Sequence, residues 1–169
     1  MWKSLLCAGI FSAFGLSGED AERVGQQAPV LKAVDQDEKE VDFAELYKRG
    51  KVLVYFYPKA DTPGCTAQSC SLRDAYETLT DAGVIVVGVS TDDSKAQKRF
   101  QKKYNLPFIL VADADKKVVK AFGVPTIFGF AKRQAFLIID GKIAWYDSRA
   151  STKKQAEDVL GILEQLKKG

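Results

Sequence analysis

Two nearly unbroken runs of β-branched and aromatic residues, 51–57 and 84–89, constrain the fold of this chain more than any other feature. Such runs are typical of strands buried on both faces, because neither face carries the polar residues that water would require. Between the runs, apolar residues from 72 to 79 recur at the spacing of one helix face, and Gly83 follows them. We therefore expect a helix over residues 64–81 that connects two central strands.

The remaining segments continue the alternation of strands and helices. Two short apolar segments, 28–34 and 40–43, flank a polar stretch and predict a hairpin ahead of the first central strand. Further strands are expected at 108–112, 134–139 and 143–146, and further helices at 93–104, 116–122 and 152–168. A chain of 169 residues without repeats fits one α/β domain. We expect a central mixed β-sheet flanked by helices, with an N-terminal β-hairpin extension.

The first eighteen residues differ from the rest of the chain. Lys3 is followed by an apolar stretch to Leu16, and the charged residues begin at Glu19. This pattern predicts a signal peptide over residues 1–18 and a domain over residues 19–169. The mature domain is then expected in the periplasm or otherwise exported. The apolar stretch is shorter than a membrane-spanning helix, so no stable membrane insertion of the mature domain is expected. The alternative is a cytoplasmic protein that retains the N-terminal extension.

The chain has no histidine, which excludes catalytic triads, Cys-His dyads and His-ligated zinc. Its net charge of +3 is too small to predict nucleic-acid binding. Of its three cysteines, Cys7 lies in the N-terminal segment, which leaves too few ligands for a zinc site. We expect neither a metal nor a cofactor.

Cys65 is the strongest candidate for a reactive group. It follows Thr62-Pro63-Gly64 and lies in the first turn of the expected helix, directly after a central strand. Unpaired amide groups at a helix N-terminus favour an anion, so this position favours the thiolate form. The alternative is that Cys65 is a small buried hydrophobic residue, as many free cysteines are.

Cys70 lies five residues further along the same expected helix. On a regular helix this spacing separates the two Cα atoms by about 8.7 Å, whereas a disulfide requires less than about 7 Å. A bond between Cys65 and Cys70 would therefore require the first turns of the helix to unwind. The alternative is that Cys70 is packed in the helix and does not react.

The segment Val54–Cys70 resembles the peroxiredoxins of the bacterioferritin comigratory protein, or Q, subfamily. Pro58, Thr62 and Cys65 match the Pro-x-x-x-Thr-x-x-Cys signature of that family. The similarity extends from about Gly25 to the C-terminus and includes segments 72–74, 87–92 and 133–142. The resemblance implies a thioredoxin-like fold and a thiol-dependent peroxidase of the atypical two-cysteine type.

The resemblance also implies roles for individual residues. Cys65 would attack hydrogen peroxide or an organic hydroperoxide as the peroxidatic cysteine, while Arg133 stabilises the thiolate and the departing oxygen. Thr62 would form hydrogen bonds with the peroxide and the thiolate, and Pro58 would shield the pocket from water. Cys70 would form an intramolecular disulfide with Cys65, which a thioredoxin-like donor reduces. Relatives in this family are often monomers.

Two other functions remain open at this point. One is an exported thiol-disulfide oxidoreductase that acts on protein disulfides. The other is a binding or holdase module whose cysteines respond to oxidation without turnover. The Cys65–Cys70 spacing and Arg133 favour the peroxidase over both.

Overall fold

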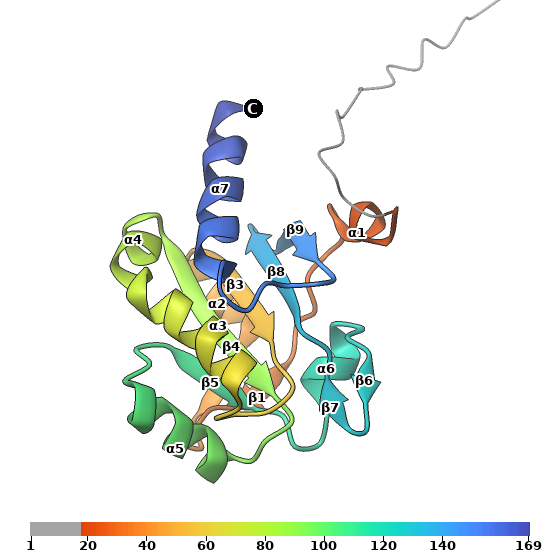
Figure 1. Ribbon diagram of the computed structural model, residues 1–169. Coiled ribbons are helices and arrows are strands. Elements are labelled where there is room, and N and C mark those ends of the chain that lie inside the picture. Colours follow the sequence, from red (N-terminus) through yellow and green to blue (C-terminus); the bar gives the residue numbers. More distant parts are fainter. Residues whose placement is uncertain (1–17) are drawn as a thin grey trace, which may run out of the picture.

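A five-stranded mixed sheet forms the centre of the computed structural model, which describes residues 18–169 (Figure 1). The strands are β3 (Lys51–Phe56), β4 (Val84–Ser90), β5 (Ile109–Ala112), β8 (Gln134–Ile139) and β9 (Lys142–Asp147), and their order across the sheet is β5-β4-β3-β8-β9. β3, β4 and β5 are parallel, whereas β8 is antiparallel to both β3 and β9. The two apolar runs of the sequence thus lie side by side as β3 and β4, and the expected mixed sheet is confirmed.

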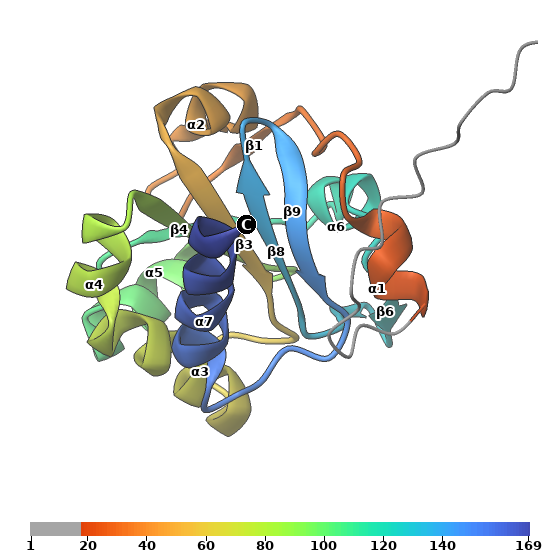
Figure 2. The same cartoon turned by 90° about the horizontal axis from the view of Figure 1, so that it is seen from above.

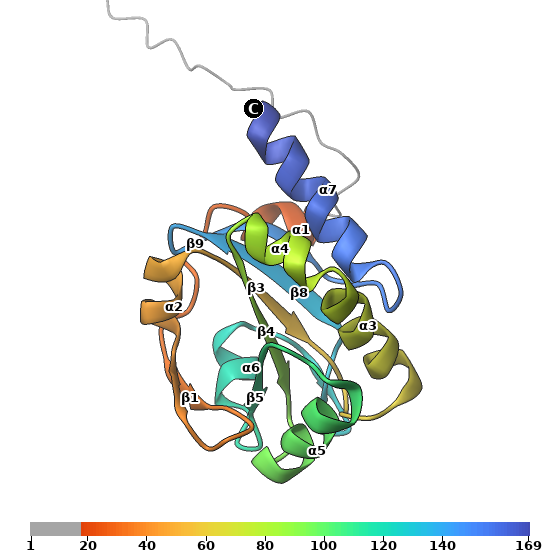
Figure 3. The ribbon, with the colours of Figure 1, turned by 90° about the vertical axis from the view of Figure 1, so that its left-hand side faces the viewer.

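Helices cover both faces of this sheet (Figures 2 and 3). The helices are α1 (Gly18–Arg23), α2 (Phe43–Arg49), α3 (Pro63–Asp74), α4 (Tyr76–Asp81), α5 (Ser94–Tyr104), α6 (Lys117–Ala121) and α7 (Gln155–Lys168). Alternate residues of β3 point to opposite faces, which divides the core into two clusters. One face packs against α2 and α6, and the other packs against α3, α4, α5 and α7.

The expected hairpin is present but shorter than predicted. β1 (Lys32–Val34) pairs antiparallel with β2 (Glu40–Asp42). Phe43, predicted at the end of the second strand, is instead the first residue of α2. Asp42 explains why the helix begins here, because its carboxylate accepts a hydrogen bond from the Ala44 amide at 2.9 Å and caps the helix.

The prediction of one continuous helix over residues 64–81 is wrong. α3 ends at Asp74, Ala75 has φ −98° and ψ 10°, and α4 begins at Tyr76. The bend directs the Tyr76 ring onto Phe108, with 6.1 Å between the ring centroids. No glycine or proline marks the break, so only the tertiary packing reveals it.

Three short elements were not predicted: α1, α2 and a small hairpin formed by β6 (Thr126–Ile127) and β7 (Phe130–Ala131). The other elements begin and end within a few residues of their predicted bounds. The predicted signal peptide lies outside the described residues except for Gly18, so it stays a prediction. Across residues 18–169, we find no helix with the length and apolar character needed to span a membrane.

Candidate active site

The junction between β3 and α3 carries most of the predicted site residues. Half-buried Pro58 follows the strand, and Thr62 is the last extended residue before the helix, with φ −94° and ψ 155°. Pro63 then begins the helix, where its fixed φ and missing N–H group are both tolerated. Cys65 is consequently the third residue of α3, within the turn whose amide groups have no partner inside the helix.

Two residues of the loop before the helix, Ala60 and Asp61, make hydrogen bonds to other parts of the domain. The Ala60 amide donates to a carboxylate oxygen of Asp92 at 2.8 Å. Asp61, at φ +60°, accepts from Lys103 Nζ at 2.9 Å and from the Tyr104 hydroxyl at 2.7 Å. These contacts hold the pKa of Asp61 below its ordinary value, with the Lys103 hydrogen bond as the largest cause.

Arg133 brings a fixed positive charge to Cys65. The Cys65 side chain is 1% exposed, and its Sγ accepts a hydrogen bond from Arg133 Nη2 at 3.4 Å. Arg133 lies directly before β8, whose pairing with β3 brings together two residues that are 68 positions apart. The helix N-terminus and the guanidinium both favour a negative sulfur, because each presents positive charge to it.

Gly64 permits this close approach. A Cβ at this position would stand 3.1 Å from Arg133 Nη2 and 3.4 Å from Thr152 Cγ2. A side chain here would therefore require the guanidinium to shift by a few tenths of an ångström. The sequence did not mark Gly64 as part of the site.

Two buried glutamines form a hydrogen-bonded chain behind Arg133. Arg133 Nη1 donates to Gln68 Oε1, and Gln68 Nε2 donates to Gln155 Oε1 at 2.7 Å. Both glutamines are completely buried. Gln68 lies one turn after Cys65 on the same face of α3, a spacing from which its role could have been found. Gln155, the first residue of α7, carries no comparable signal.

Thr62 and Pro58 lie near Cys65 in sequence and in the loop, but they do not contact it by a hydrogen bond in this state. The Thr62 hydroxyl donates to the Lys59 carbonyl at 2.8 Å. Its proton is therefore used within the loop, and its oxygen lone pairs remain free to accept. The expected bond from Thr62 to the thiolate is not formed in this geometry.

Cys70 is half-buried and lies within the same continuous helix as Cys65. Both cysteines of the described chain are free thiols, as expected while α3 is intact. Beneath this helix, the buried Tyr55 hydroxyl lies 2.9 Å from Ser69 Oγ. Burial raises the pKa of Tyr55 more than this hydrogen bond lowers it, so the phenol stays protonated and anchors the helix.

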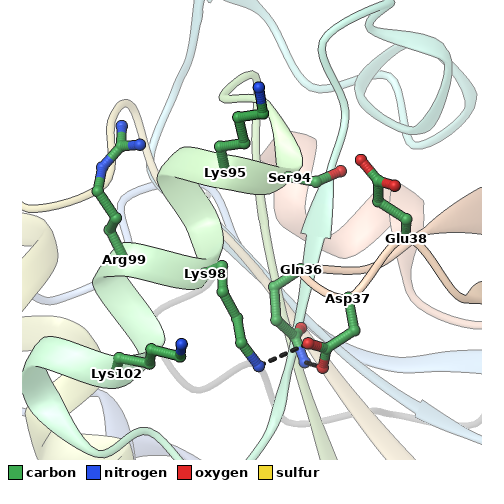
Figure 4. Close-up of a pocket in the computed structure, with 8 residues that line it drawn as sticks. All are labelled: Gln36, Asp37, Glu38, Ser94, Lys95, Lys98, Arg99 and Lys102. Carbon is green, nitrogen blue, oxygen red and sulfur yellow. Dashed lines mark hydrogen bonds and ion pairs between the residues drawn. The ribbon is translucent and has the colours of Figure 1, made fainter.

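A groove of about 400 Å³ lies elsewhere, between the β1–β2 hairpin and α5 (Figure 4). Lys98 crosses it and pairs with Asp37 at 2.5 Å, whereas Lys95 and Arg99 point away from that pair. None of the predicted site residues lines this groove. Within residues 18–169, no three His, Cys, Asp or Glu side chains are grouped closely enough to hold a metal ion.

Comparison with known proteins identifies the family. The model of the AhpC/TSA family matches residues 24–146. Over 146 residues the chain is 40% identical to the chloroplastic peroxiredoxin Q of Oryza sativa subsp. japonica, covering 84% of this chain and 67% of the rice protein. The chain belongs to the Q-type peroxiredoxins of the AhpC/TSA family.

Further relatives of this peroxiredoxin are bacterial. It is 48% identical over 101 residues to the peroxiredoxin bcp of Coxiella burnetii, covering 60% of this chain and 66% of that protein. The crystal structure of peroxidoxin BcpB from Mycobacterium tuberculosis matches with a TM-score of 0.79 and 30% identity, covering 85% of this chain and 97% of that one. The thioredoxin-like fold and the family resemblance are thereby confirmed.

The family assignment decides between the functions left open by the sequence. Peroxiredoxins are thiol-dependent peroxidases that use peroxide substrates and thioredoxin-like reductants, and this chain is such an enzyme. The alternative of an oxidoreductase acting on protein disulfides is not favoured, because the relatives are peroxiredoxins.

Proposed function

We propose that Cys65 is the peroxidatic cysteine and that it reduces hydrogen peroxide and organic hydroperoxides. The observation that carries this proposal is the 3.4 Å contact between Arg133 Nη2 and the Sγ of a cysteine in the first turn of α3. The Cys65 thiolate attacks one oxygen of the peroxide, an S–O bond forms and the O–O bond breaks. Cys65 becomes a sulfenic acid, and the departing oxygen takes up a proton and leaves as water or an alcohol.

Arg133 and Thr62 take complementary parts in this step. The Arg133 guanidinium, whose Nη2 lies 3.4 Å from the sulfur, stabilises both the thiolate and the oxygen that departs. Thr62 donates to the incoming peroxide once its hydroxyl rotates away from the Lys59 carbonyl, to which it donates at 2.8 Å. Pro58, half-buried at the end of β3, limits the access of water to the sulfur.

Cys70 completes the cycle as the resolving cysteine. Its thiol attacks the Cys65 sulfenic acid, a disulfide forms and water leaves. The helix must unwind first, which breaks the Gln68–Gln155 and Tyr55–Ser69 hydrogen bonds that hold it. A thioredoxin-like dithiol then reduces the disulfide by exchange and is itself oxidised.

The test is mass spectrometry of the full chain after one equivalent of peroxide, combined with turnover assays in the presence of a thioredoxin system. We expect the wild-type protein to contain one new disulfide between Cys65 and Cys70. Cys70→Ser should stop at the Cys65 sulfenic acid, and Cys65→Ser should show no turnover. Full peroxide turnover by Cys65→Ser would overturn the proposal.

We also propose that residues 1–18 direct export, so that the enzyme, residues 19–169, acts in the periplasm as a monomer. An exported enzyme requires a donor in its own compartment, because cytosolic thioredoxin would not reach it. The mass of the protein purified from its native host checks the cleavage, and light scattering checks the monomer. An intact N-terminus would instead support the cytoplasmic alternative.

A further inference from the structure

The β6–β7 hairpin presents an apolar tip that no other part of the described chain covers. Phe128 is 95% exposed, Ile127 is 52% exposed and Phe130 is 42% exposed. The hairpin lies beside α6 at the edge of the molecule (Figure 1). Large apolar side chains that cluster on an exposed surface mark a site of interaction with a protein or a membrane.

The residue at the turn is unfavourable for the turn itself. Phe128 and Gly129 form a two-residue turn in which both have positive φ, at +51° and +82°. Asparagine and glycine adopt this conformation readily, whereas a bulky side chain at the first position is strained. Phe128 therefore makes the turn less stable and exposes an apolar ring to water. A residue kept in an unfavourable backbone conformation at an exposed position points to a function in binding.

Two lysines, Lys59 and Lys116, lie close to this tip. The sequence contains five lysines and arginines and no acidic residue between Asp115 and Asp140, the stretch that includes the whole hairpin. Lys59 Nζ lies 6.0 Å from the centre of the Phe130 ring. Lys116 Nζ also approaches the turn, since a Cβ on Gly129 would stand 3.6 Å from it. Acidic residues are also near: Asp115 precedes Lys116 in the chain, and Asp92 and Asp93 follow Thr91, whose hydroxyl donates to the Gly129 carbonyl at 3.0 Å.

We propose that the β6–β7 hairpin docks onto the surface of an anionic lipid bilayer. Phe128 and Ile127 would enter the boundary between headgroups and acyl chains, and the lysines would contact the anionic headgroups. A single convex tip with lysines at its base suits a deformable lipid surface better than a protein surface, which would need a complementary pocket.

Docking in this orientation brings one edge of the proposed active site to the lipid surface. Lys59 belongs to the loop between β3 and α3, and Arg133 follows β7 after a single intervening residue. Peroxides formed at the bilayer surface would then meet the enzyme close to Cys65. The docking itself does not depend on the proposed catalytic cycle.

The test compares full-length variants in sedimentation with vesicles. Phe128→Asn suits the positive φ of the turn, so it should fold at least as well as the wild type. Val30→Asn removes another exposed apolar side chain, 68% accessible, and is the matched control. We expect binding to phosphatidylcholine vesicles that contain about one third phosphatidylglycerol, weakening with salt, and little binding to phosphatidylcholine alone. Phe128→Asn should weaken the binding about tenfold, whereas Val30→Asn should not change it.

A fluorescent reporter separates the hairpin from the N-terminal segment. Phe128→Trp keeps an aromatic tip, and its emission is compared with that of the wild type, which has only Trp2 and Trp145. We expect an additional blue-shifted signal that brominated lipids quench. Binding that Phe128→Asn does not weaken, or a Phe128→Trp signal that the lipids do not quench, would overturn the proposal. The proposal would also be overturned if the wild type does not bind lipid but forms a concentration-dependent dimer or binds an acidic protein partner, and Phe128→Asn loses that interaction.

Discussion

Gln68 and Gln155 connect the helix that carries Cys65 to the C-terminal helix by a buried hydrogen bond of 2.7 Å. The same Gln68 side chain accepts from Arg133, so the orientation of the guanidinium depends on a residue at the start of α7. The Ala156 amide donates to Ser71 Oγ at 3.3 Å and adds a second bond between these helices. The geometry around Cys65 is therefore set partly by a segment 90 residues away in the chain.

Gln155→Leu should slow the reaction with peroxide without removing any group that touches the substrate. The substitution leaves the Gln68 amide buried without its acceptor, which costs about 1–3 kcal/mol of stability. Because Arg133 loses its support, we expect the second-order rate constant with peroxide to fall about tenfold. Stopped-flow measurement of peroxide reduction tests this expectation.

Leu163→Ala is the control for Gln155→Leu. Leu163 lies in the same helix and is 4% exposed, so its truncation costs about 2–5 kcal/mol of stability. It should leave the rate with peroxide unchanged. Equal slowing by both variants would mean that α7 acts only through general stability.

Gly64→Ala should reduce activity while leaving the fold intact. Alanine is the better helix former, but its Cβ would meet Arg133 Nη2 at 3.1 Å and push the guanidinium away from Cys65. We expect the rate with peroxide to fall about tenfold. Gly161→Ala in α7 is the matched control, because nothing lies within 4 Å of a Cβ at that position. It should gain stability, read as a higher melting temperature, with unchanged activity.

Some residues of the site could be predicted from the sequence and others could not, and this division has a physical cause. Cys65 could be placed because its helix start is encoded locally, in a strand followed by Thr62-Pro63-Gly64. The contact to Arg133 required the family resemblance, since it arises from strand pairing across 68 positions. Gln155 could not be found, because its contact depends on how α7 packs against α3.

The fold shows the same division between local and long-range signals. The buried strands β3 and β4 followed directly from their composition. α2 could also have been found, because Asp42 and Glu45 have the spacing of a capping box. The β6–β7 hairpin could not, because Phe128 occupies a turn position where asparagine or glycine would have marked it.

Tyr55→Phe should accelerate formation of the disulfide. The Tyr55 hydroxyl is bonded to Ser69, between Cys65 and Cys70, and therefore holds the segment that must unwind. Removing one buried hydrogen bond costs about 1 kcal/mol, which favours the unwound state about fivefold. Rapid-quench measurement of disulfide formation after a peroxide pulse should show this increase.

Tyr57→Phe provides the comparison for Tyr55→Phe. Tyr57, directly after β3, is also fully buried in the same core cluster as Tyr55, but its hydroxyl donates to Gln97 of α5. Its removal should lower stability by a similar amount and leave the rate of disulfide formation unchanged. Similar acceleration by both variants would exclude a specific role for the Tyr55–Ser69 bond.

Asp61 should hold the loop before Cys65 throughout the neutral and mildly acidic range. Its pKa is lowered in the folded protein, chiefly by Lys103 and then by Tyr104. A carboxyl group of this kind stabilises the fold above its ordinary pKa, and the contribution disappears as pH falls through the lowered value. The rate of amide hydrogen exchange in residues 58–62 should therefore not rise, beyond the intrinsic pH effect, until pH falls below the ordinary Asp range.

A variant of Asp61 tests the same contact at neutral pH. Asp61→Asn keeps a residue that tolerates φ +60° but removes the charge, so the loop should exchange faster at neutral pH. Asp93→Asn, at the N-cap of α5, should not affect the loop. Equal exchange in wild type and Asp61→Asn would show that the Ala60–Asp92 bond alone holds the loop.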